Sequence, residues 1–321
     1  MSALPKITIS LTGGLGNQLF QLAAGLSLSK NHHLYLTDAY GRPRVNKKNE
    51  AEILSFRLPS KVVFVDRSKA GWFVSKVSGY LLRVGIAPKR YEGRSFFWKM
   101  LELISSIIFS ADIKESTRVV FSKNIGHSEI KVPSGNSLLI GYFQSYFWAF
   151  EPKVKDLLMR ITPLESPPVI EEFRLLSIIE RPLVVHVRLG DYLDQSEFGI
   201  PSVDYYNAAI EKLLATQKYS KIWVFSDDLE GAKLRLSLDY GVGIRFVRSD
   251  EYSSAVTLEI MRLGNGYVIA NSTFGWWAAV LSKNNNAEIV APDPWFSRIK
   301  EPVNLIPNHW TRIKSIHTFN K

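Results

Sequence analysis

Cysteine is absent from the 321-residue sequence, and only six histidines occur. The absence of cysteine excludes disulfides and thiol nucleophiles, and together with the scarcity of histidine it argues against a structural zinc site. The N-terminal residues lack the basic start and long apolar run of a secretory signal, and no stretch reaches about 18 uncharged apolar residues. We therefore expect a cytoplasmic protein without a membrane-spanning helix.

The composition is that of a folded protein. Hydrophobic residues make up 46% of the chain and charged residues 22%, which is enough apolar surface for a core. The length exceeds what a single core usually organises. Prolines border two predicted helices at 153–160 and 169–179, and this punctuation indicates a linker. We predict two domains, residues 1–165 and 166–321.

The net positive charge is confined to the N-terminal half. Residues 1–150 contain 20 lysine and arginine residues against 9 aspartate and glutamate residues, whereas residues 151–321 contain 20 against 21. An excess of one sign attracts partners of the opposite sign. The pattern indicates an anionic partner, such as nucleic acid, a membrane surface or a phosphate-bearing substrate. A role in solubility explains it equally well.

Strand and helix patterns alternate at both ends of the chain. At the N-terminus a strand at 7–11 is followed by a glycine turn, a helix at 18–30 and a strand at 34–37. Residues 40–135 are less regular. Beyond them the pattern predicts strands at 137–142, 183–187, 221–225, 244–246, 266–270 and 288–291, and further helices at 205–215, 229–238, 254–262 and 273–281. Such alternation is typical of α/β domains with parallel sheets.

The segment from Gly13 to Gln21 lies between the first strand and the first helix and reads Gly-Gly-Leu-Gly-Asn-Gln-Leu-Phe-Gln. Glycines allow a ligand to approach the backbone closely, and a helix N-terminus offers free N–H groups to a phosphate. A dinucleotide-binding interpretation uses Gly14, Gly16 and Asp38, but Leu19 stands where the third glycine belongs. A tight turn that needs glycine only for its dihedral angles is the structural alternative.

The segment from His186 to Tyr192 follows an apolar strand and reads His-Val-Arg-Leu-Gly-Asp-Tyr. Ligands of α/β domains bind at the carboxyl ends of strands, and alternate residues such as His186 and Arg188 point to the same face. The planar guanidinium of Arg188 can hold two phosphate oxygens at once. The alternative is structural: an ion pair of Arg188 with Asp191, and a His186 that bonds to the backbone.

Two later strand ends also carry polar residues. Ser226, Asp227 and Asp228 end the strand at 221–225 and could bind a base or a ribose, although helix capping is favoured for Asp228. The segment 270–279 reads Ala-Asn-Ser-Thr-Phe-Gly-Trp-Trp-Ala-Ala and enters a helix. Its hydroxyls and free N–H groups predict a phosphate site. Its two tryptophans are expected to pack the helix against the sheet.

These motifs, in this order and approximate spacing, resemble those of the α-1,2-fucosyltransferases, glycosyltransferase family eleven. They are GGLGNQLFQ, HVRLGDY, FSDD and NSTFGWWAA, together with GYFQS at 141–145, and the resemblance runs from Ile7 to about Trp295. One position departs from the family pattern, because Leu189 replaces the second arginine of His-x-Arg-Arg-x-Asp. The related protein O-fucosyltransferases resemble this chain there, with one arginine followed by an aliphatic residue and glycine.

The resemblance implies a fold and a site. The implied fold is α/β and GT-B-like, with two Rossmann-type α/β domains facing a central cleft. Residues 1–165 would form the acceptor-side domain, and residues 166–321 would bind the GDP-sugar. The residues implied in catalysis are Arg188, His186 and Asp191. Those implied in donor binding are Asn17, Gly14, Gly16, Arg188, Asp227, Ser272, Thr273 and Phe274.

The resemblance also implies a reaction. An inverting glycosyltransferase would move L-fucose from GDP-β-L-fucose to the 2-hydroxyl of a galactose-type acceptor in bacterial surface polysaccharide synthesis. No Asp-x-Asp triplet occurs, so neither a metal nor another cofactor is expected. Three alternatives stay open: a transferase for another GDP-sugar, an NAD-dependent dehydrogenase, and a basic nucleic-acid-binding protein.

Aromatic and basic residues alternate between Gly71 and Ile108. Such a segment could rest against an anionic membrane surface, as suits an enzyme whose glycan acceptor is lipid-linked. Core helices of the N-terminal domain explain the same pattern. The sequence therefore leaves two interpretations, peripheral contact with the inner face of the plasma membrane and ordinary core packing.

Overall fold

The computed structural model describes residues 5–30, 33–65, 76, 80, 95–113, 115–190, 197–216, 218–237 and 239–318. Contacts divide the chain into two compact units. The first comprises Met1–Ile161 and Pro302–Leu305, and the second comprises Thr162–Glu301 and Ile306–Lys321. The division lies close to the boundary predicted at 165/166. The return of the chain at 302–305 has no sequence signal; it depends on backbone bonds such as that from Tyr146 N to Asn304 O (2.8 Å).

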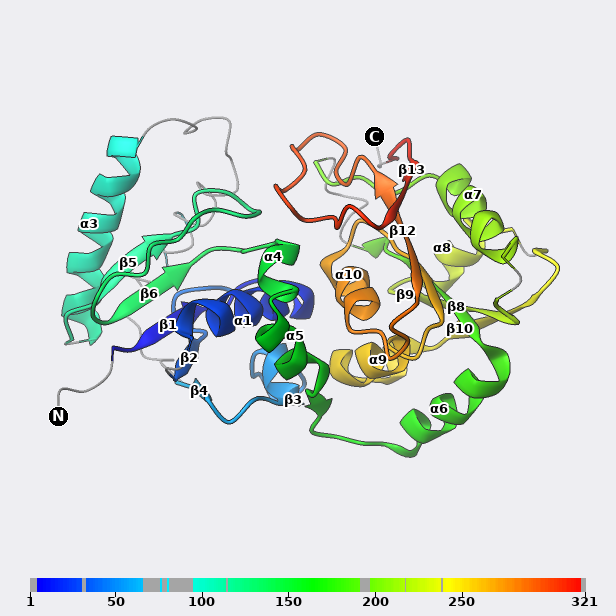
Figure 1. The fold of residues 1–321 in the computed structure, drawn as a ribbon, viewed down its shortest axis with the longest axis horizontal. Helices are drawn as coiled ribbons and strands as arrows, with labels where there is room; N and C mark the ends of the chain where they lie inside the picture. The colour runs from blue at the N-terminus through cyan, green and yellow to red at the C-terminus, as the bar shows by residue number, and fades with distance from the viewer. Residues whose placement is uncertain are drawn as a thin grey trace. The chain divides into compact units, whose positions relative to one another are not determined.

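The first unit contains a five-stranded parallel sheet in the order β4-β2-β1-β6-β5 (Figure 1). The order changes direction between β1 and β6. Strands β2 and β4 lie on one side of β1, and strands β6 and β5 lie on the other side. The elements are β1 (Ile7–Ser10), α1 (Leu15–Ser29), β2 (Leu34–Thr37), the 3-10 helix η1 (Glu52–Ser55), β3 (Phe56–Arg57), β4 (Val62–Phe64), α3 (Ser95–Ile113), β5 (Arg118–Phe121), β6 (Ser137–Ile140), α4 (Tyr146–Ala149) and α5 (Pro152–Met159).

The second unit contains a six-stranded parallel sheet in the order β10-β9-β8-β11-β12-β13. Numbered from β8, this is the order 3-2-1-4-5-6 of two Rossmann halves. The elements are β7 (Thr162–Pro163), α6 (Pro168–Glu180), β8 (Pro182–Val187), α7 (Val203–Leu214), β9 (Lys221–Ser226), α8 (Leu229–Lys233), β10 (Gly243–Val247), the 3-10 helix η4 (Ser249–Glu251), α9 (Ser254–Met261), β11 (Gly266–Val268), α10 (Thr273–Val280), β12 (Glu288–Asp293) and β13 (Thr311–Lys314).

The central strands of the second unit are buried on both faces. All six residues of β8 are buried, and so are five of the six residues of β9. Unbroken apolar runs of this kind are typical of parallel strands covered by helices on both sides. The core includes Tyr205 and Tyr206 of α7 packed over these strands. The prediction of two Rossmann-type α/β domains with parallel sheets is confirmed.

Each strand and helix predicted outside 40–135 is present, with ends shifted by three residues or fewer, except at α8. That helix ends at Lys233 rather than at 238. Beyond it, Ser237 Oγ donates to Asp239 O and accepts from Asp239 N, both at 3.3 Å, and this local turn competes with helix continuation. None of the described helices is long and apolar enough to cross a bilayer.

Helix α3 lies beside β5, the edge strand of the first sheet, and bonds to its outward N–H groups (Figure 1). The acceptors on α3 are spaced four residues apart and so lie along one side of the helix. The bonds run from Thr117 N to Ser110 Oγ (2.9 Å), from Val119 N to Ser106 Oγ (2.9 Å) and from Phe121 N to Glu102 Oε1 (3.4 Å). The helix therefore covers an edge that would otherwise expose unpaired backbone.

Candidate active site

Three polar segments predicted from the sequence meet at one edge of the second sheet. Strands β9, β8 and β11 are neighbours and run parallel, so the residues that follow them lie at the same edge. Arg188 follows β8, Asp227 follows β9, and 271–274 follow β11. A backbone bond from Ala270 N to His186 O (3.1 Å) joins the last segment to β8. The strand order changes direction between β8 and β11, which is where open α/β sheets bind ligands.

Arg188 is held by the carboxylate of Asp227. Arg188 Nη1 lies 3.1 Å from Asp227 Oδ2, and Leu189 N donates to Asp227 Oδ1 at 2.9 Å. A side chain at Gly190 would place its Cβ 2.2 Å from Asp227 Oδ2, so any larger residue there would displace the Asp227 carboxylate. The Arg188 side chain keeps 18% of its surface exposed. The turn after β8 thus presents an oriented and still accessible guanidinium, and its carboxylate partner is Asp227. Asp191 lies outside the described residues.

His186 is buried and neutral. Burial, and after it the charge of Arg188, lower the pKa of His186 to about 3. A Cβ at Gly275 would lie 2.5 Å from His186 Nδ1, so the imidazole packs directly on the first turn of α10. The ring of Phe274 lies 6.0 Å away, centroid to centroid. Within the described residues, His186 Nδ1 has no hydrogen-bond partner. An imidazole with so low a pKa is a weak proton acceptor near neutral pH.

The segment before α10 forms a helix start. Ser272 caps the helix, and its Oγ accepts from Phe274 N at 3.3 Å. Asn271 Nδ2 donates to Phe198 O (3.1 Å) and Gly199 O (2.9 Å). These two bonds hold the segment that leads into α7. Trp276 and Trp277 are fully buried, so the prediction that they pack in the core is confirmed. Likewise, Asp228 caps α8 by accepting from Gly231 N at 2.9 Å, as the sequence favoured.

In the first unit, the glycine turn leads into α1 as predicted, but an acidic side chain already binds the helix start. Leu15 N donates to Glu52 Oε2 at 2.7 Å. Gly14 is the N-cap residue, and Gly13 has a φ of +70°, which favours glycine. Gly16 is buried inside the first turn of the helix. A carboxylate at this position takes an N–H group that the sequence assigned to a phosphate, and it adds negative charge there.

The glutamines of the same motif are structural. Gln18 Nε2 donates to Gly13 O (2.8 Å) and Arg44 O (3.0 Å), and Gln18 Oε1 accepts from Ile53 N (2.8 Å). Gln21 Nε2 donates to Gly141 O at 2.9 Å. These bonds tie α1 to the turn before it, to the segment around Arg44, to η1 and to the segment after β6. Much of the polarity that draws attention to the motif in the sequence therefore serves the fold.

Asn17 makes a contact that links it to a second strand end. Gln144 Nε2 donates to Asn17 Oδ1 at 2.9 Å, and Gln144 is buried. Asn17 follows β1 and Gln144 follows β6, so the pair lies where the order of the first sheet changes direction. Phe143, directly before Gln144, has a φ of +54°, a strained conformation for a residue with a side chain. Gln144 is a candidate site residue that motif reasoning did not single out, although it belongs to GYFQS.

The structure thus distributes the predicted residues over two places. His186, Arg188, Asp227, Ser272, Thr273 and Phe274 lie at the switch point of the second sheet, and Gly14, Gly16 and Asn17 lie at that of the first. Among the described residues, no three His, Cys, Asp or Glu side chains gather closely enough to hold a metal ion. The expected independence of metals stays a prediction.

Comparison with known proteins identifies relatives, two of which match most of the chain. The profile of Glycosyl transferase family 11 matches residues 127–313. An alpha-1,2-colitosyltransferase of Escherichia coli is 25% identical over 96% of this chain and 99% of its own length. The O-antigen biosynthesis glycosyltransferase WbnK of Escherichia coli is 26% identical over 89% of this chain and 94% of its own. A galactoside 2-alpha-L-fucosyltransferase of Caenorhabditis elegans is 27% identical over 54% of this chain and 52% of its own length.

Among solved structures, NodZ alpha-1,6-fucosyltransferase soaked with GDP-fucose covers 92% of this chain and 97% of that chain. The sequence identity is 12% and the TM-score is 0.46.

Proposed function

Because the chain belongs to glycosyl transferase family 11, it is a glycosyltransferase, and we propose that its donor is GDP-β-L-fucose and its acceptor the 2-hydroxyl of a galactose-type glycan. The 2-alpha-L-fucosyltransferase among its relatives supports the donor and the linkage. The O-antigen glycosyltransferase of Escherichia coli supports a place in bacterial surface polysaccharide synthesis. With a lipid-linked acceptor, the enzyme would work at the inner face of the plasma membrane.

Arg188 carries the proposal. Its guanidinium is oriented by Asp227 at 3.1 Å, is accessible, and stands at the switch point of a Rossmann-type sheet. A planar guanidinium in that place can hold two oxygens of a diphosphate. The first turn of α10 follows the neighbouring strand β11 and adds N–H groups and a positive helix end. Both features stabilise the charge that develops on GDP as it leaves.

The proposed step is an in-line displacement at the anomeric carbon of fucose. The acceptor O2–C1 bond forms on the face opposite to the C1–O bond that breaks, so a β-linked donor gives an α-linked product. GDP departs with the bonding electrons, and the proton of the acceptor hydroxyl passes to a base. The low pKa of His186 makes it a poor base, so we assign it to shaping the donor pocket. We assign the proton to Asp191, three positions beyond Arg188 in the sequence.

The remaining predicted residues have more modest proposed roles. Ser272, Thr273 and Phe274 would line the nucleotide pocket. Asp227 would orient Arg188 in addition to the guanosine contact predicted for it. In the first unit, the Glu52 carboxylate at the start of α1 makes Asn17 a better candidate for approaching the donor than Gly14 or Gly16.

The central experiment is release of GDP from GDP-fucose with galactose-terminated acceptors, with and without EDTA. We expect Arg188→Ala to lower turnover by about a hundredfold or more. Arg174→Ala removes an exposed arginine of α6 and should have no effect. Circular dichroism would show that both variants fold. Near-normal turnover of Arg188→Ala would overturn the proposed role, and activity lost in EDTA but restored by manganese would overturn metal independence.

A second donor is favoured by one relative. The colitosyltransferase of Escherichia coli matches nearly the whole chain, and colitose differs from fucose in lacking the 3-hydroxyl. A site that hydrogen-bonds this hydroxyl would reject the deoxy sugar by about ten-thousandfold, whereas an apolar site would discriminate far less. Comparing kcat/KM for GDP-fucose and GDP-colitose therefore separates the two functions. A preference for GDP-colitose would replace the proposed donor and leave the assignment of Arg188 intact.

A further inference from the structure

Helix α3 has an outward face that is almost entirely apolar. We call Phe96, Met100, Leu103, Ile104 and Ile107 the outer stripe. Their exposed fractions range from 42% to 79%, and their spacing places them along one side of the helix. Lys99 is the charged residue that accompanies them on this side. The outward face of a surface helix is normally polar, and contiguous exposed apolar surface usually marks an interaction site.

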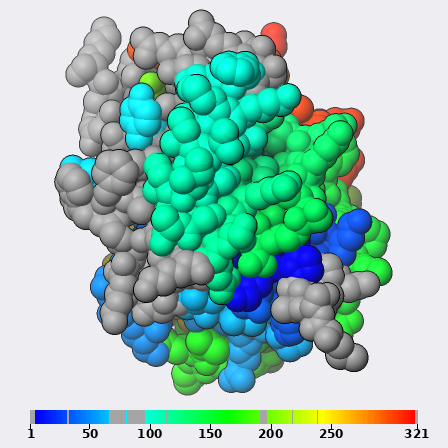
Figure 2. Space-filling model, turned by 90° about the vertical axis from the view of Figure 1, so that its left-hand side faces the viewer, coloured from blue at the N-terminus to red at the C-terminus, as the bar shows by residue number. Residues whose placement is uncertain are grey.

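The outer stripe is not needed to hold α3 in place. Trp98 and Phe109 point inward and are buried against the sheet, where the Phe109 ring lies 4.8 Å from that of Tyr40. A second side of the helix bonds to β5 through Glu102, Ser106 and Ser110. The stripe forms a third side. Figure 2 shows residues 95–113, in turquoise, at the surface of the first unit.

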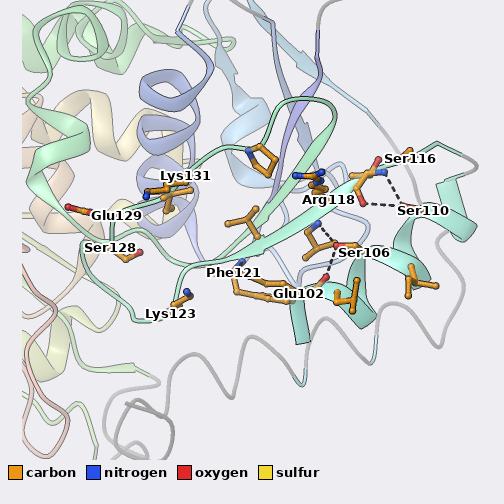
Figure 3. Close-up of a pocket in the computed structure, with 17 residues that line it drawn as sticks. Glu102, Ser106, Ser110, Ser116, Arg118, Phe121, Lys123, Ser128, Glu129 and Lys131 are labelled. Carbon is orange, nitrogen blue, oxygen red and sulfur yellow. Dashed lines mark hydrogen bonds between the residues drawn. The ribbon is translucent and has the colours of Figure 1, made fainter. Parts of the chain in front are cut away.

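A groove that carries basic side chains adjoins the stripe. It has a volume of about 900 Å³ and is lined by α3, β5 and the segment 128–133. Leu103 and Ile107 of the stripe are among its lining residues. Arg118, Lys123 and Lys131 are its exposed cations (Figure 3). Of its two carboxylates, Glu102 accepts a bond from Phe121 N and Glu129 is exposed. Apolar and cationic side chains are thus combined on one surface.

We infer that the outer stripe and this groove form a contact surface for an anionic lipid bilayer. Apolar side chains of a helix lying on a membrane enter the boundary between headgroups and acyl chains, while neighbouring lysine and arginine side chains bind lipid phosphates. The excess of basic residues in the N-terminal 150 residues adds long-range attraction to such a surface. The inference concerns a surface remote in sequence from Arg188, and it does not depend on the identity of the donor.

Both earlier interpretations of 71–108 therefore apply to the part of this segment that the structure describes continuously, 95–108. Its inward side chains pack in the core, as the structural interpretation predicted. Its outward side chains are those of the proposed membrane surface. Apart from Lys76 and Tyr80, residues 71–94 lie outside the described residues.

Helix α6 provides a matched control. Its Ile178 and Ile179 are 72% and 75% exposed, as apolar and as open as the outer stripe. Exposed Glu171 and Glu172 lie on the same helix, so this patch has the wrong charge for an anionic surface. The stripe variant, Leu103→Ser with Ile107→Ser, removes two apolar side chains of the outer stripe. The charge variant, Lys123→Glu with Lys131→Glu, reverses two charges of the groove. The control variant is Ile178→Ser with Ile179→Ser.

The test is flotation of the full chain with vesicles of phosphatidylcholine alone or mixed with phosphatidylglycerol, at low and high salt. We expect binding to the anionic vesicles, weakened by salt. The stripe variant should lose about tenfold or more of it, because each buried aliphatic side chain adds substantially to partitioning. The charge variant should lose the salt-sensitive part, and the control should bind like the parent. All three should keep their turnover of GDP-fucose with a soluble acceptor.

Two results would overturn the inference. One is an absence of binding to anionic vesicles at low salt, or binding that the stripe variant retains in full. The other is a dimer in sedimentation analysis that the stripe variant converts to monomer, since a second copy of the chain would then cover the stripe. Because soluble-acceptor turnover is measured in parallel, failure here is distinguishable from failure of the proposed transferase function.

Discussion

At the scale of single residues, Asp227 uses both carboxylate oxygens to build the candidate donor site. One accepts from Leu189 N at 2.9 Å and the other pairs with Arg188 at 3.1 Å. Asparagine in its place keeps the shape and one acceptor oxygen but removes the charge. A displacement of about 1 Å at a reacting centre can cost about a hundredfold in rate. We expect Asp227→Asn to lower kcat by about tenfold to a hundredfold in an initial-rate assay of GDP release.

The neighbouring Asp228 supplies the control for this prediction. Its carboxylate caps α8 through Gly231 N, and asparagine caps helices about as well as aspartate. Asp228→Asn should therefore leave both turnover and the free energy of unfolding close to those of the parent protein. Equal turnover in the two variants would show that Arg188 keeps its orientation without Asp227.

The low pKa of His186 predicts that the stability of the folded protein, rather than its catalysis, depends on pH. Its pKa is about 3 in the folded protein, against an ordinary value of 6.5 in the unfolded chain. The unfolded state therefore binds a proton as the pH falls below about 6.5, while the folded state does not, so the folded state loses stability from there down to about pH 3. The loss is about 1.4 kcal/mol per pH unit, or about 2 kcal/mol between pH 7 and pH 5.

Urea unfolding at the two pH values measures this effect. His186→Gln cannot take up the proton, so its free energy of unfolding should fall by about 2 kcal/mol less than that of the parent over the same interval. His309→Gln replaces an exposed histidine of the same unit and should behave like the parent. Parallel losses in parent and His186→Gln would mean that His186 is protonated in the folded state.

At the scale of secondary-structure elements, the sequence predicts best where strands are unbroken apolar runs with turn residues at their ends, as in β8 and β9. It gives no bounds for α3, although core helices were one interpretation of 71–108, because a helix that is apolar on its inner and outer sides has no clear amphipathic period. It also misses β13, which reads Thr-Arg-Ile-Lys and is half-buried or exposed throughout. These elements depend on tertiary contacts. Helix α3 packs beside the edge strand β5, and strand β13 pairs with β12.

A buried ion pair at the C-terminal end of α9 also has no clear signal in the sequence. Arg262 is fully buried at the end of the helix, and its Nη1 bonds to Glu259 Oε2 at 2.7 Å while its Nε donates to Leu281 O at 2.9 Å. Removing one partner of such a pair leaves a buried charge uncompensated. We expect Glu259→Gln to lower the free energy of unfolding by about 3 kcal/mol or more, measured by urea denaturation.

The exposed pair Glu230–Lys233 has the same spacing of three residues and the same 2.7 Å separation. Glu230→Gln should lower the free energy of unfolding by less than about 0.5 kcal/mol, because solvent screens an exposed pair. A similar small effect for Glu259→Gln would mean that water reaches Arg262. The contrast separates Arg262, an arginine paired for structure, from Arg188, whose accessible guanidinium we assign to the donor.

At the scale of the whole molecule, strand order rather than closeness in the sequence decides which candidate residues lie together. Asn17 and Gln144 are 127 positions apart, yet they bond because β1 and β6 are adjacent in the sheet. The motif order along the chain predicts that Arg188 and Ser272 belong to one site, since both follow strands. It does not predict the Asn17–Gln144 bond or Glu52 at the start of α1, because these depend on which strands and loops become neighbours.

Strand order also leads to a prediction about ligand binding in each unit, which amide hydrogen exchange of the full chain can follow. If the nucleotide binds the second unit, GDP should slow exchange at 186–190, 226–228 and 272–275, by up to about a hundredfold at a ligand concentration of 100 Kd. If Asn17 contacts the fucose of the donor, the segment 13–17 of the first unit should respond to GDP-fucose more than to GDP. Arg188→Ala should abolish the protection by GDP. Protection by GDP confined to 13–17 would reverse the proposed roles of the two units, since the first glycine motif would then be the nucleotide site despite Glu52.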